Sequence, residues 1–324
     1  MKKRTLGRTG WSVSEIGFGA WGIGAKWWGP TDDRASLDAL AAAWDAGINF
    51  FDTAYVYGDG HSEQLIAKAL AGKPAVVATK VPPKNDVWPA KSGSPVNESF
   101  PADWIRSCTE RSLKNLKRDA LDLQQLHVWT DSWLAKDEWK ETVARLKKEG
   151  KIRAFGVSIN DHDPNSAVEL VASGLVDTVQ VIFNIFDQSP AEKLLPLCKE
   201  HNVGVIVRVP LDEGGLTGTL TKDTTFPKGD FRGSYFRGDN LTQTVTRVDK
   251  LKGLLNGEAQ TMPELALRFL LSHDAVSTVI AGMRQKKNVA MNTAVSDGRA
   301  LSPSLMGELK KHAWARNFYG RWDD

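Results

Sequence analysis

The sequence has few cysteines and no long apolar run. Only two of its 324 residues are cysteine, Cys108 and Cys198, and they lie too far apart for a metal-binding motif. No metal is expected, and the scarcity of cysteine predicts a reduced, cytoplasmic setting. Nowhere do about 18 apolar residues follow one another without a charge, so no membrane span is expected. The first residues break into Gly, Ser and Thr before any apolar core of a signal peptide forms.

A large charge of one sign is also missing. The net charge is only +3, and lysine and arginine form no dense stripe, so no nucleic-acid partner is expected. The hydrophobic content of 41% is enough to bury a sizeable core. We expect one domain over residues 1–324. The sequence predicts no oligomeric state.

Short apolar runs alternate with longer segments of helical period. Eight runs are typical of strands, at 15–20, 48–52, 75–80, 121–127, 152–158, 178–183, 203–209 and 276–281. The helical segments that follow them lie at 32–46, 62–71, 103–117, 137–149, 164–173, 190–201, 261–273 and 285–294. Eight strand-helix units in a chain of this length predict an α/β fold, a closed (β/α)₈ TIM barrel.

Three additions to the barrel are expected. The first fifteen residues predict an N-terminal hairpin turned by "GRTG". The loops after the third strand, 82–102, and after the seventh, 210–260, are long and rich in Pro, Gly, Ser and Trp. A C-terminal helical extension begins at Ser302. Because long barrel loops usually carry function, we expect the site beside them.

The stretch "GFGAWG" matches the glycine pattern of a Rossmann nucleotide site, with Gly17, Gly19 and Gly22. In that motif the third glycine opens a helix whose N-terminus binds pyrophosphate. Here a proline and two tryptophans follow before a helical period begins near Asp32, and Trp21 would crowd a phosphate. The pattern therefore disfavours a Rossmann site.

Ionisable side chains end three successive strands. Asp52 follows "INFF", Lys80 follows "AVVAT" and His127 follows "LDLQQL", while Tyr57 lies in the loop after the second strand. Each alone is ordinary, as a helix cap, a solvated charge or a structural histidine. Their combination favours a site, because residues at the carboxyl ends of barrel strands face the same mouth.

These four residues suit carbonyl reduction. A phenol titrates near 10, so Tyr57 is a poor proton donor at neutral pH unless a cation lowers its pKa. Lys80 is expected to be that cation, and Asp52 to keep Lys80 charged. His127 is expected to orient a carbonyl oxygen. Together they would protonate the alkoxide that hydride addition produces.

The motifs "FFDTAYVYGDGHSE", "VVATK" and "LQQLHVW" resemble those of the aldo-keto reductases, in particular the bacterial long-chain members. The resemblance runs from the opening residues to about residue 294. It implies a (β/α)₈ barrel that transfers hydride from NADPH to an aldehyde or ketone, with NADH the less expected cofactor. It also implies that Asp52, Tyr57, Lys80 and His127 are the catalytic tetrad and that Tyr57 is the general acid.

The resemblance further implies that NADPH lies extended across the barrel mouth. The cofactor contacts it implies are Gly19, Ala20, Trp21, Ser158, Gln180, Pro210, Leu211, Gly215, Thr217, Gly282, Gln285, Asn288 and Asn292. Arg284, at a helix start, is expected to bind the 2′-phosphate.

Two positions depart from the family pattern. Ile159 stands where an asparagine is usual, so Asn160 is expected to bind the carboxamide instead. Arg208 stands where an aromatic ring usually stacks on the nicotinamide. A guanidinium plane also stacks, but its charge is expected to disfavour the positively charged oxidised ring.

Five aromatic residues on the expected loops are predicted to line the substrate pocket: Trp21, Trp28, Trp88, Trp129 and Phe186. Such a wall suits sugars, aromatic aldehydes and flat ketones equally well. Its chemistry selects no single small-molecule carbonyl substrate.

Two functions other than carbonyl reduction are also consistent with a barrel fold: hydrolysis and nicotinamide sensing. A barrel hydrolase needs two carboxylates across its mouth, and Asp52 is the one acid at a strand end. A non-catalytic or weakly catalytic nicotinamide-sensing partner protein on the same fold is the alternative that stays open. The presence of Tyr57, Lys80 and His127 together favours an enzyme.

Overall fold

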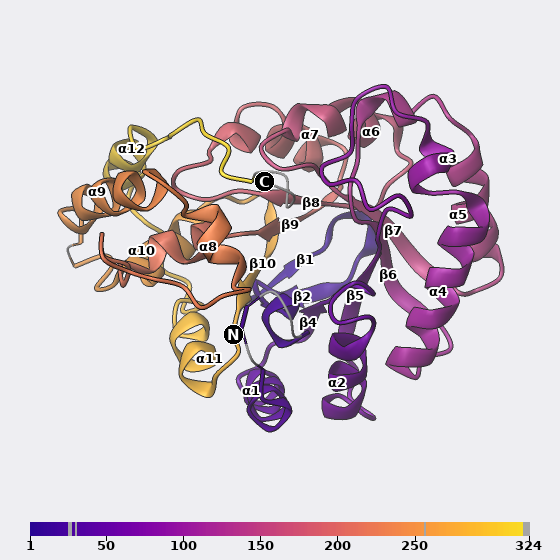
Figure 1. Cartoon of the computed structure of the whole chain (residues 1–324), viewed down its shortest axis with the longest axis horizontal. Helices are drawn as coiled ribbons and strands as arrows, with labels where there is room; N and C mark the ends of the chain where they lie inside the picture. The colour runs from indigo at the N-terminus through magenta and orange to yellow at the C-terminus, as the bar shows by residue number, and fades with distance from the viewer. Residues whose placement is uncertain (25–27, 30, 256, 320–324) are drawn as a thin grey trace.

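The strands of the protein close into a barrel (Figure 1). The structure is a computed structural model and describes residues 1–319 except 25–27, 30 and 256. The barrel strands are parallel and follow the order β10-β3-β4-β5-β6-β7-β8-β9. Their bounds are β3 Ile16–Gly19, β4 Phe50–Asp52, β5 Val76–Val81, β6 Leu121–Leu126, β7 Ile152–Ser158, β8 Thr178–Ile182, β9 Gly204–Arg208 and β10 Val276–Gly282. The predicted (β/α)₈ barrel is confirmed.

Helices surround the barrel, one after each strand (Figure 1). They are α1 Asp33–Asp45, α2 His61–Ala69, α4 Ala102–Leu116, α5 Glu138–Lys148, α6 Val168–Ser173, α7 Leu194–Glu200, α10 Met262–Leu271 and α11 Lys286–Thr293. The segments predicted as helices at 164–173 and 190–201 each start with a 3-10 turn, at Pro164–Ala167 and Ser189–Ala191. A proline lies at each turn, where its missing N–H costs no helical hydrogen bond.

A two-stranded hairpin closes the amino end of the barrel. Strands β1 Lys3–Thr5 and β2 Ser12–Ser14 pair antiparallel, and Leu6 and Val13 reach into the apolar cluster inside the barrel. The Arg4 guanidinium donates hydrogen bonds to the backbone carbonyls of Leu271, His273 and Val276, at the end of α10 and the start of β10. The predicted hairpin is confirmed, at the end of the strands opposite their carboxyl termini.

The long loops and the chain end lie at the other end of the barrel. The loop after β5 carries α3 Val96–Ser99, and the loop after β9 carries a 3-10 segment, Asp212–Thr217, with α8 Phe231–Tyr235 and α9 Asn240–Lys252. The extension forms α12 Pro303–Lys310. In Figure 1 the segment after α12, up to residue 319, returns toward β8 and β9.

Side chains inside the barrel change from apolar to polar along the strands. Phe50, Ala78, Leu123 and Ile206 belong to the inner apolar cluster. Two residues further along the same strands stand Asp52, Lys80, Gln125 and Arg208. Because strand residues two apart face the same side, these four form a polar layer at the carboxyl ends.

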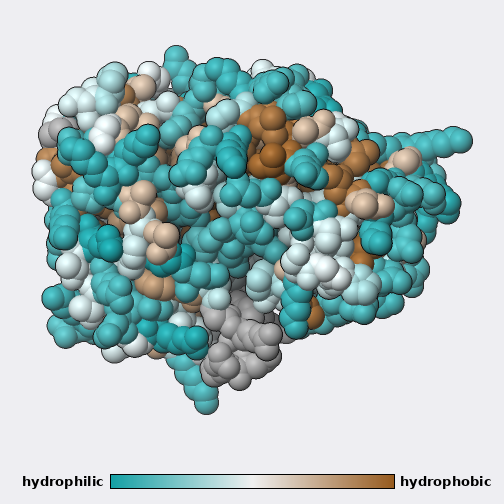
Figure 2. Space-filling view, turned by 90° about the horizontal axis from the view of Figure 1, so that it is seen from above, coloured by the Kyte–Doolittle hydropathy of each residue, from teal (hydrophilic) through white to brown (hydrophobic). Residues whose placement is uncertain are grey.

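The outer surface is largely hydrophilic on the face that Figure 2 presents, with hydrophobic side chains gathered in a few places. Both cysteines are buried and free. Within the described ranges, the helices are all too short or too polar to cross a membrane.

Candidate active site

A cavity of about 1730 Å³ lies at the carboxyl ends of the barrel strands. Sites for ordinary small ligands measure roughly 300–1000 Å³, so this one has room for a dinucleotide together with a substrate. It brings together most of the residues that the sequence predicted. These are Gly19, Ala20, Trp21, Trp28, Asp52, Tyr57, Trp88, His127, Ser158, Asn160, Gln180, Arg208, Pro210, Leu211, Thr217, Gly282, Arg284, Gln285, Asn288 and Asn292.

Two predicted pocket residues lie elsewhere. Trp129 is fully buried beside Trp133 and Trp139, with ring centroids 6.1 and 5.5 Å away, and its indole donates to the Ser166 carbonyl. Phe186 is buried against Trp314 outside the cavity. The prediction that both line the pocket is wrong, because each ring faces the core behind its loop.

Two predicted phosphate-binding residues serve the loop itself. Gly215 is buried and does not line the cavity, and a Cβ there would lie 2.9 Å from the Asp212 carboxylate. Thr217 lines the cavity, but its hydroxyl donates to the Gly214 carbonyl at 2.6 Å. Gly215 is therefore needed for packing rather than for contact with a ligand.

A buried ion pair forms the floor of the cavity. The Lys80 ammonium donates to Asp52 Oδ1 at 2.5 Å and to the Thr53 carbonyl at 2.8 Å, and the Lys80 side chain is fully buried. Burial lowers the pKa of Lys80, and the charge of Asp52 opposes that shift. The second oxygen of Asp52 accepts from Gln180 at 2.8 Å and from Gln125 at 3.5 Å. Asp52 is thus held from both sides.

Gln125 belongs to this network and the sequence analysis missed it. Its position two residues after the inward-facing Leu123 was the available signal, because strand side chains alternate. Gln180 was predicted to bind the cofactor carboxamide. Its amide nitrogen is already bonded to Asp52, which leaves the amide oxygen for such a contact.

Tyr57 lies above the ion pair in a tight turn. Gly58 follows it with φ +68°, and a Cβ there would approach the Gly24 carbonyl to 1.9 Å, so only glycine allows this turn. The Lys80 ammonium is 5.2 Å from the centre of the Tyr57 ring. The Tyr57 hydroxyl has no hydrogen-bond partner among the residues described.

The electrostatics of Tyr57 differ from the sequence prediction. Burial and then the charge of Asp52 raise its pKa above the usual 10, and Arg208 is the cation that opposes this shift. The expected lowering of the pKa by Lys80 is therefore wrong for this structure. Tyr57 is protonated at neutral pH, as a proton donor must be.

His127 faces Tyr57 and Trp88, with ring centroids 5.7 and 4.8 Å away in edge-to-face geometry. Burial, followed by the charges of Lys80 and Arg208, holds the pKa of His127 well below 6.5. The ring is therefore neutral and carries one N–H donor. Its Nδ1 atom is buried without a partner among the described residues.

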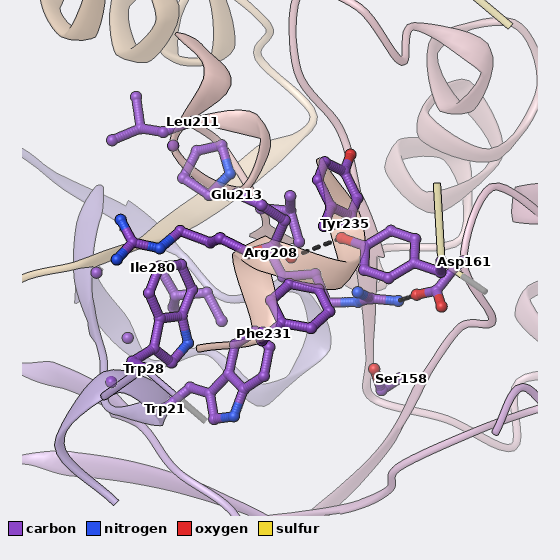
Figure 3. A pocket seen from close by; sticks show the side chains of 18 of the residues that line it. Trp21, Trp28, Ser158, Asp161, Arg208, Leu211, Glu213, Phe231, Tyr235 and Ile280 are labelled. Atoms are coloured by element: carbon purple, nitrogen blue, oxygen red, sulfur yellow. Dashed lines mark hydrogen bonds and ion pairs between the residues drawn. The ribbon is translucent and has the colours of Figure 1, made fainter. Parts of the chain in front are cut away.

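Arg208 is fixed by groups that the sequence analysis did not identify. One guanidinium nitrogen donates to Asp161 at 2.7 Å and to the Ile159 carbonyl at 3.0 Å (Figure 3). Asp161 offsets the guanidinium charge that was expected to disfavour an oxidised nicotinamide. No sequence signal identified Asp161, because the pair joins the last residue of β9 to the loop after β7.

Asn160 is used by the protein itself. Its amide oxygen accepts from the Ala90 N–H at 3.1 Å, and its amide nitrogen donates to the Ala90 carbonyl at 2.9 Å. Asn160 thereby clamps the loop that brings Trp88 against His127. The predicted carboxamide contact would have to use the second N–H or the second lone pair of this amide, and it stays a prediction.

Aromatic and basic residues form the far end of the cavity. Trp21, Trp28 and Phe231 gather there, with Trp21 and Phe231 centred 5.2 Å apart (Figure 3). Arg284 donates to the Trp28 carbonyl at 2.7 Å and forms no ion pair with any described residue. Neighbouring Arg232 is paired with Asp230 at 2.6 Å.

Comparison with known proteins identifies the family. The model of the aldo/keto reductase family matches residues 15–313. The chain belongs to the aldo/keto reductase family. This reductase is 32% identical to the NADH-specific methylglyoxal reductase of Escherichia coli, over 95% of its own length and 98% of that protein.

Solved structures agree with this assignment. The reductase is similar to the aldo-keto reductase AKR11C1 of Bacillus halodurans in its holo form, with a TM-score of 0.76, 30% identity and full coverage of both chains. It is also similar to the glycerol dehydrogenase AKR11B4 of Gluconobacter oxydans, with a TM-score of 0.79 and 30% identity over 96% and 94% of the two chains. The protein is thus a carbonyl-reducing oxidoreductase of a family that uses nicotinamide cofactors.

The residues of the reductase fit such a cofactor. Asn292 is 1% exposed and lines the cavity, yet neither polar atom of its amide has a partner in the described part of the chain. A buried polar group without a partner is costly unless a ligand or water satisfies it. The cavity therefore has a site prepared for a polar ligand beside Arg284 and Asn288.

Proposed function

We propose that this reductase converts a small aldehyde or ketone into an alcohol with NADPH, and that Tyr57 is the general acid. The observation that carries the proposal is the arrangement of Tyr57 over the buried Lys80–Asp52 pair, beside neutral His127. Protonated phenol, neutral imidazole and fixed ammonium are the groups that protonation of a developing alkoxide requires.

Each of these side chains has a distinct task. The imidazole N–H of His127 holds the carbonyl oxygen, and Tyr57 transfers its proton to that oxygen as negative charge develops there. The phenolate left on Tyr57 is stabilised by the Lys80 ammonium beneath its ring. Asp52 keeps that ammonium charged, since an unpaired buried lysine would lose its proton. The nicotinamide, when bound, supplies the hydride.

The cofactor would lie along the residues that line the cavity. Ser158 and the amide oxygen of Gln180 suit the carboxamide, and Asn288 and Asn292 suit the adenosine. Arg284 suits a 2′-phosphate, because its guanidinium is free of carboxylate partners within the described residues. This supports NADPH over NADH, although the Escherichia coli relative is named as NADH-specific.

The experiment that tests the cofactor assignment is a titration with NADPH and, separately, NADH, followed by quenching of tryptophan fluorescence. Arg284→Ala is expected to weaken NADPH about tenfold or more and NADH by less than about twofold. Lys286→Ala is the matched control, because this exposed side chain lies two residues after Arg284, at the start of α11, and pairs with Asp38. Equal binding of both nucleotides, unaltered in Arg284→Ala, would contradict the preference for NADPH.

The role of Tyr57 needs a separate measurement. Tyr57→Phe is expected to reduce turnover of aldehydes about 10²- to 10⁴-fold while the dissociation constant of NADPH stays within about threefold. Nucleotide binding without turnover of any carbonyl compound in the unaltered protein would favour the nicotinamide-sensing alternative.

A further inference from the structure

The segment that follows α12, up to Tyr319, contacts the loop that follows β9. Residues 312–319 run from α12 to this loop, and the Trp314 N–H donates to the Phe186 carbonyl at 2.7 Å. Two side chains of this segment, Arg316 and Tyr319, reach two successive carboxylates of the loop. We call residues 312–319 the tail and residues 209–217 the β9 loop.

The first contact is a buried ion pair. The Arg316 guanidinium pairs with the Asp212 carboxylate, and the two side chains are 4% and 1% exposed. The same carboxylate oxygen accepts from the Tyr235 hydroxyl at 3.0 Å. Among the described residues, Arg316 provides the ion pair to Asp212. Its loss would leave a buried carboxylate without a counter-charge, which is a costly state.

The second contact is a hydrogen bond one residue further along. The Tyr319 hydroxyl donates to Glu213 at 2.6 Å. The Tyr319 ring lies 5.0 Å from Tyr235 and 5.7 Å from His162, measured between centroids. The tail therefore contacts both acidic side chains of the Asp212–Glu213 turn.

The turn that these contacts hold is strained. Val209, Asp212 and Glu213 all have φ between +51° and +54°, the left-handed region that non-glycine residues disfavour. For Val209 the cost is greatest, because its side chain is branched at Cβ. Such conformations persist where surrounding contacts determine them, and here two of those contacts, to Asp212 and Glu213, come from a segment about one hundred residues away in sequence.

The strained turn is also part of the cavity wall. Val209, Pro210, Leu211, Glu213, Gly214 and Thr217 line the cavity, whereas Asp212 and Arg316 do not. We propose that Arg316 and Tyr319 are positioning residues, which shape the nucleotide groove by holding the β9 loop through Asp212 and Glu213. This inference rests on the proposed function. Because Tyr319 itself lines the cavity, Arg316 provides the cleaner test.

The chain offers a matched control for Arg316. Trp314 lies between two guanidinium groups, that of Arg316 at 4.5 Å and that of Arg247 on α9 at 4.2 Å from its ring centre. Arg247 thus makes the same contact with Trp314, whereas the ion pair to Asp212 comes from Arg316. Arg247→Ala removes a cation from the tail region and leaves the ion pair in place.

The test measures amide hydrogen exchange of residues 209–217 in the free protein and, separately, the dissociation constant of NADPH. Arg316→Ala is expected to speed exchange in this segment about tenfold and to weaken NADPH about tenfold. Arg247→Ala is expected to leave both within about twofold. Tyr319→Phe, which keeps the ring, is expected to change both in the same direction by less.

Two further variants test whether the effect of Arg316→Ala comes from loss of the ion pair or from general destabilisation of the fold. Arg316→Lys keeps the charge and is expected to bind NADPH within about threefold of the unaltered protein. Adding Asp212→Asn to Arg316→Ala removes the unpaired charge and is expected to recover part of the lost binding. Equal effects of Arg316→Ala and Arg247→Ala, or unchanged exchange in Arg316→Ala, would overturn the inference alone. If the unaltered protein bound neither nucleotide, the proposed function would be contradicted, and with it the positioning role of Arg316 and Tyr319.

Discussion

The two ends of the barrel are closed by different interactions. At the amino end, the hairpin inserts Leu6 and Val13 into the apolar interior, and Arg4 caps backbone carbonyls. At the carboxyl end, buried charges face one another, as in the Asp52–Lys80 pair and the strained turn around Asp212. The amino end therefore contributes stability. At the carboxyl end, buried charges and backbone strain lower stability but form the active site.

The largest expected effect is at the buried pair of the carboxyl end. Lys80→Met should lower turnover about 10²- to 10⁴-fold, because Tyr57 loses the cation beneath its ring. It should also lower the free energy of unfolding by about 3–5 kcal/mol, since the buried carboxylate of Asp52 would lose its counter-charge. Steady-state kinetics and urea unfolding measure the two effects. If the free energy of unfolding did not change, water would have to reach Asp52 and solvate its charge in the variant.

The matching change at the amino end should affect stability alone. Leu6→Ala removes a fully buried side chain inside the barrel and should lower the free energy of unfolding by about 2–5 kcal/mol. The dissociation constant of NADPH should change by less than about twofold. Thermal or urea unfolding together with the fluorescence titration checks both. A clear loss of binding would break the division between the two ends.

A smaller effect is expected for the clamp between two loops. Asn160→Ala leaves the N–H and carbonyl of Ala90 without partners and should raise exchange in the loop around Trp88. The cost to stability should be about 1–3 kcal/mol. Substrate KM should rise while NADPH binding is kept. If NADPH binding weakened instead, the carboxamide contact predicted from the sequence would be supported.

Per unit of pH, the smallest effect is expected at Glu213. Burial raises the pKa of Glu213 to about 7 from the usual 4.5, so the folded protein holds a proton there that the unfolded chain has lost. This stabilising contribution is complete below about pH 4.5 and is lost as the pH rises through about 7. Relative to Glu213→Gln, the unaltered protein should lose at most about 1.4 kcal/mol per pH unit across this window. Parallel profiles of the two proteins from urea unfolding would contradict the shift.

Regular structure was predictable because it depends on local periodicity. Short apolar runs located all eight barrel strands, and the ionisable residues at the ends of those runs placed Asp52 and Lys80 at one mouth. The position of Gln125, two residues after the inward-facing Leu123, also carried a signal for this layer.

Loop geometry was not predictable in this way. Trp129 and Phe186 follow strands but turn into the core, because no period fixes the direction of a loop side chain. The partners of Asn160 and Arg316 lie 70 and 104 residues away in sequence. Such contacts depend on how loops from different strands meet, and a single sequence carries no local record of them.

The tryptophans are divided between the two environments, which matters for optical experiments. Trp129, Trp133 and Trp139 are packed edge to face in the core, at most 1% exposed, whereas Trp21, Trp28 and Trp88 line the cavity. Light emitted by the core trio should be insensitive to small aqueous quenchers such as iodide. The protein thus carries an internal intensity reference beside its own reporters of ligand binding. In a titration with nucleotide, we expect substantial tryptophan fluorescence to remain at saturation.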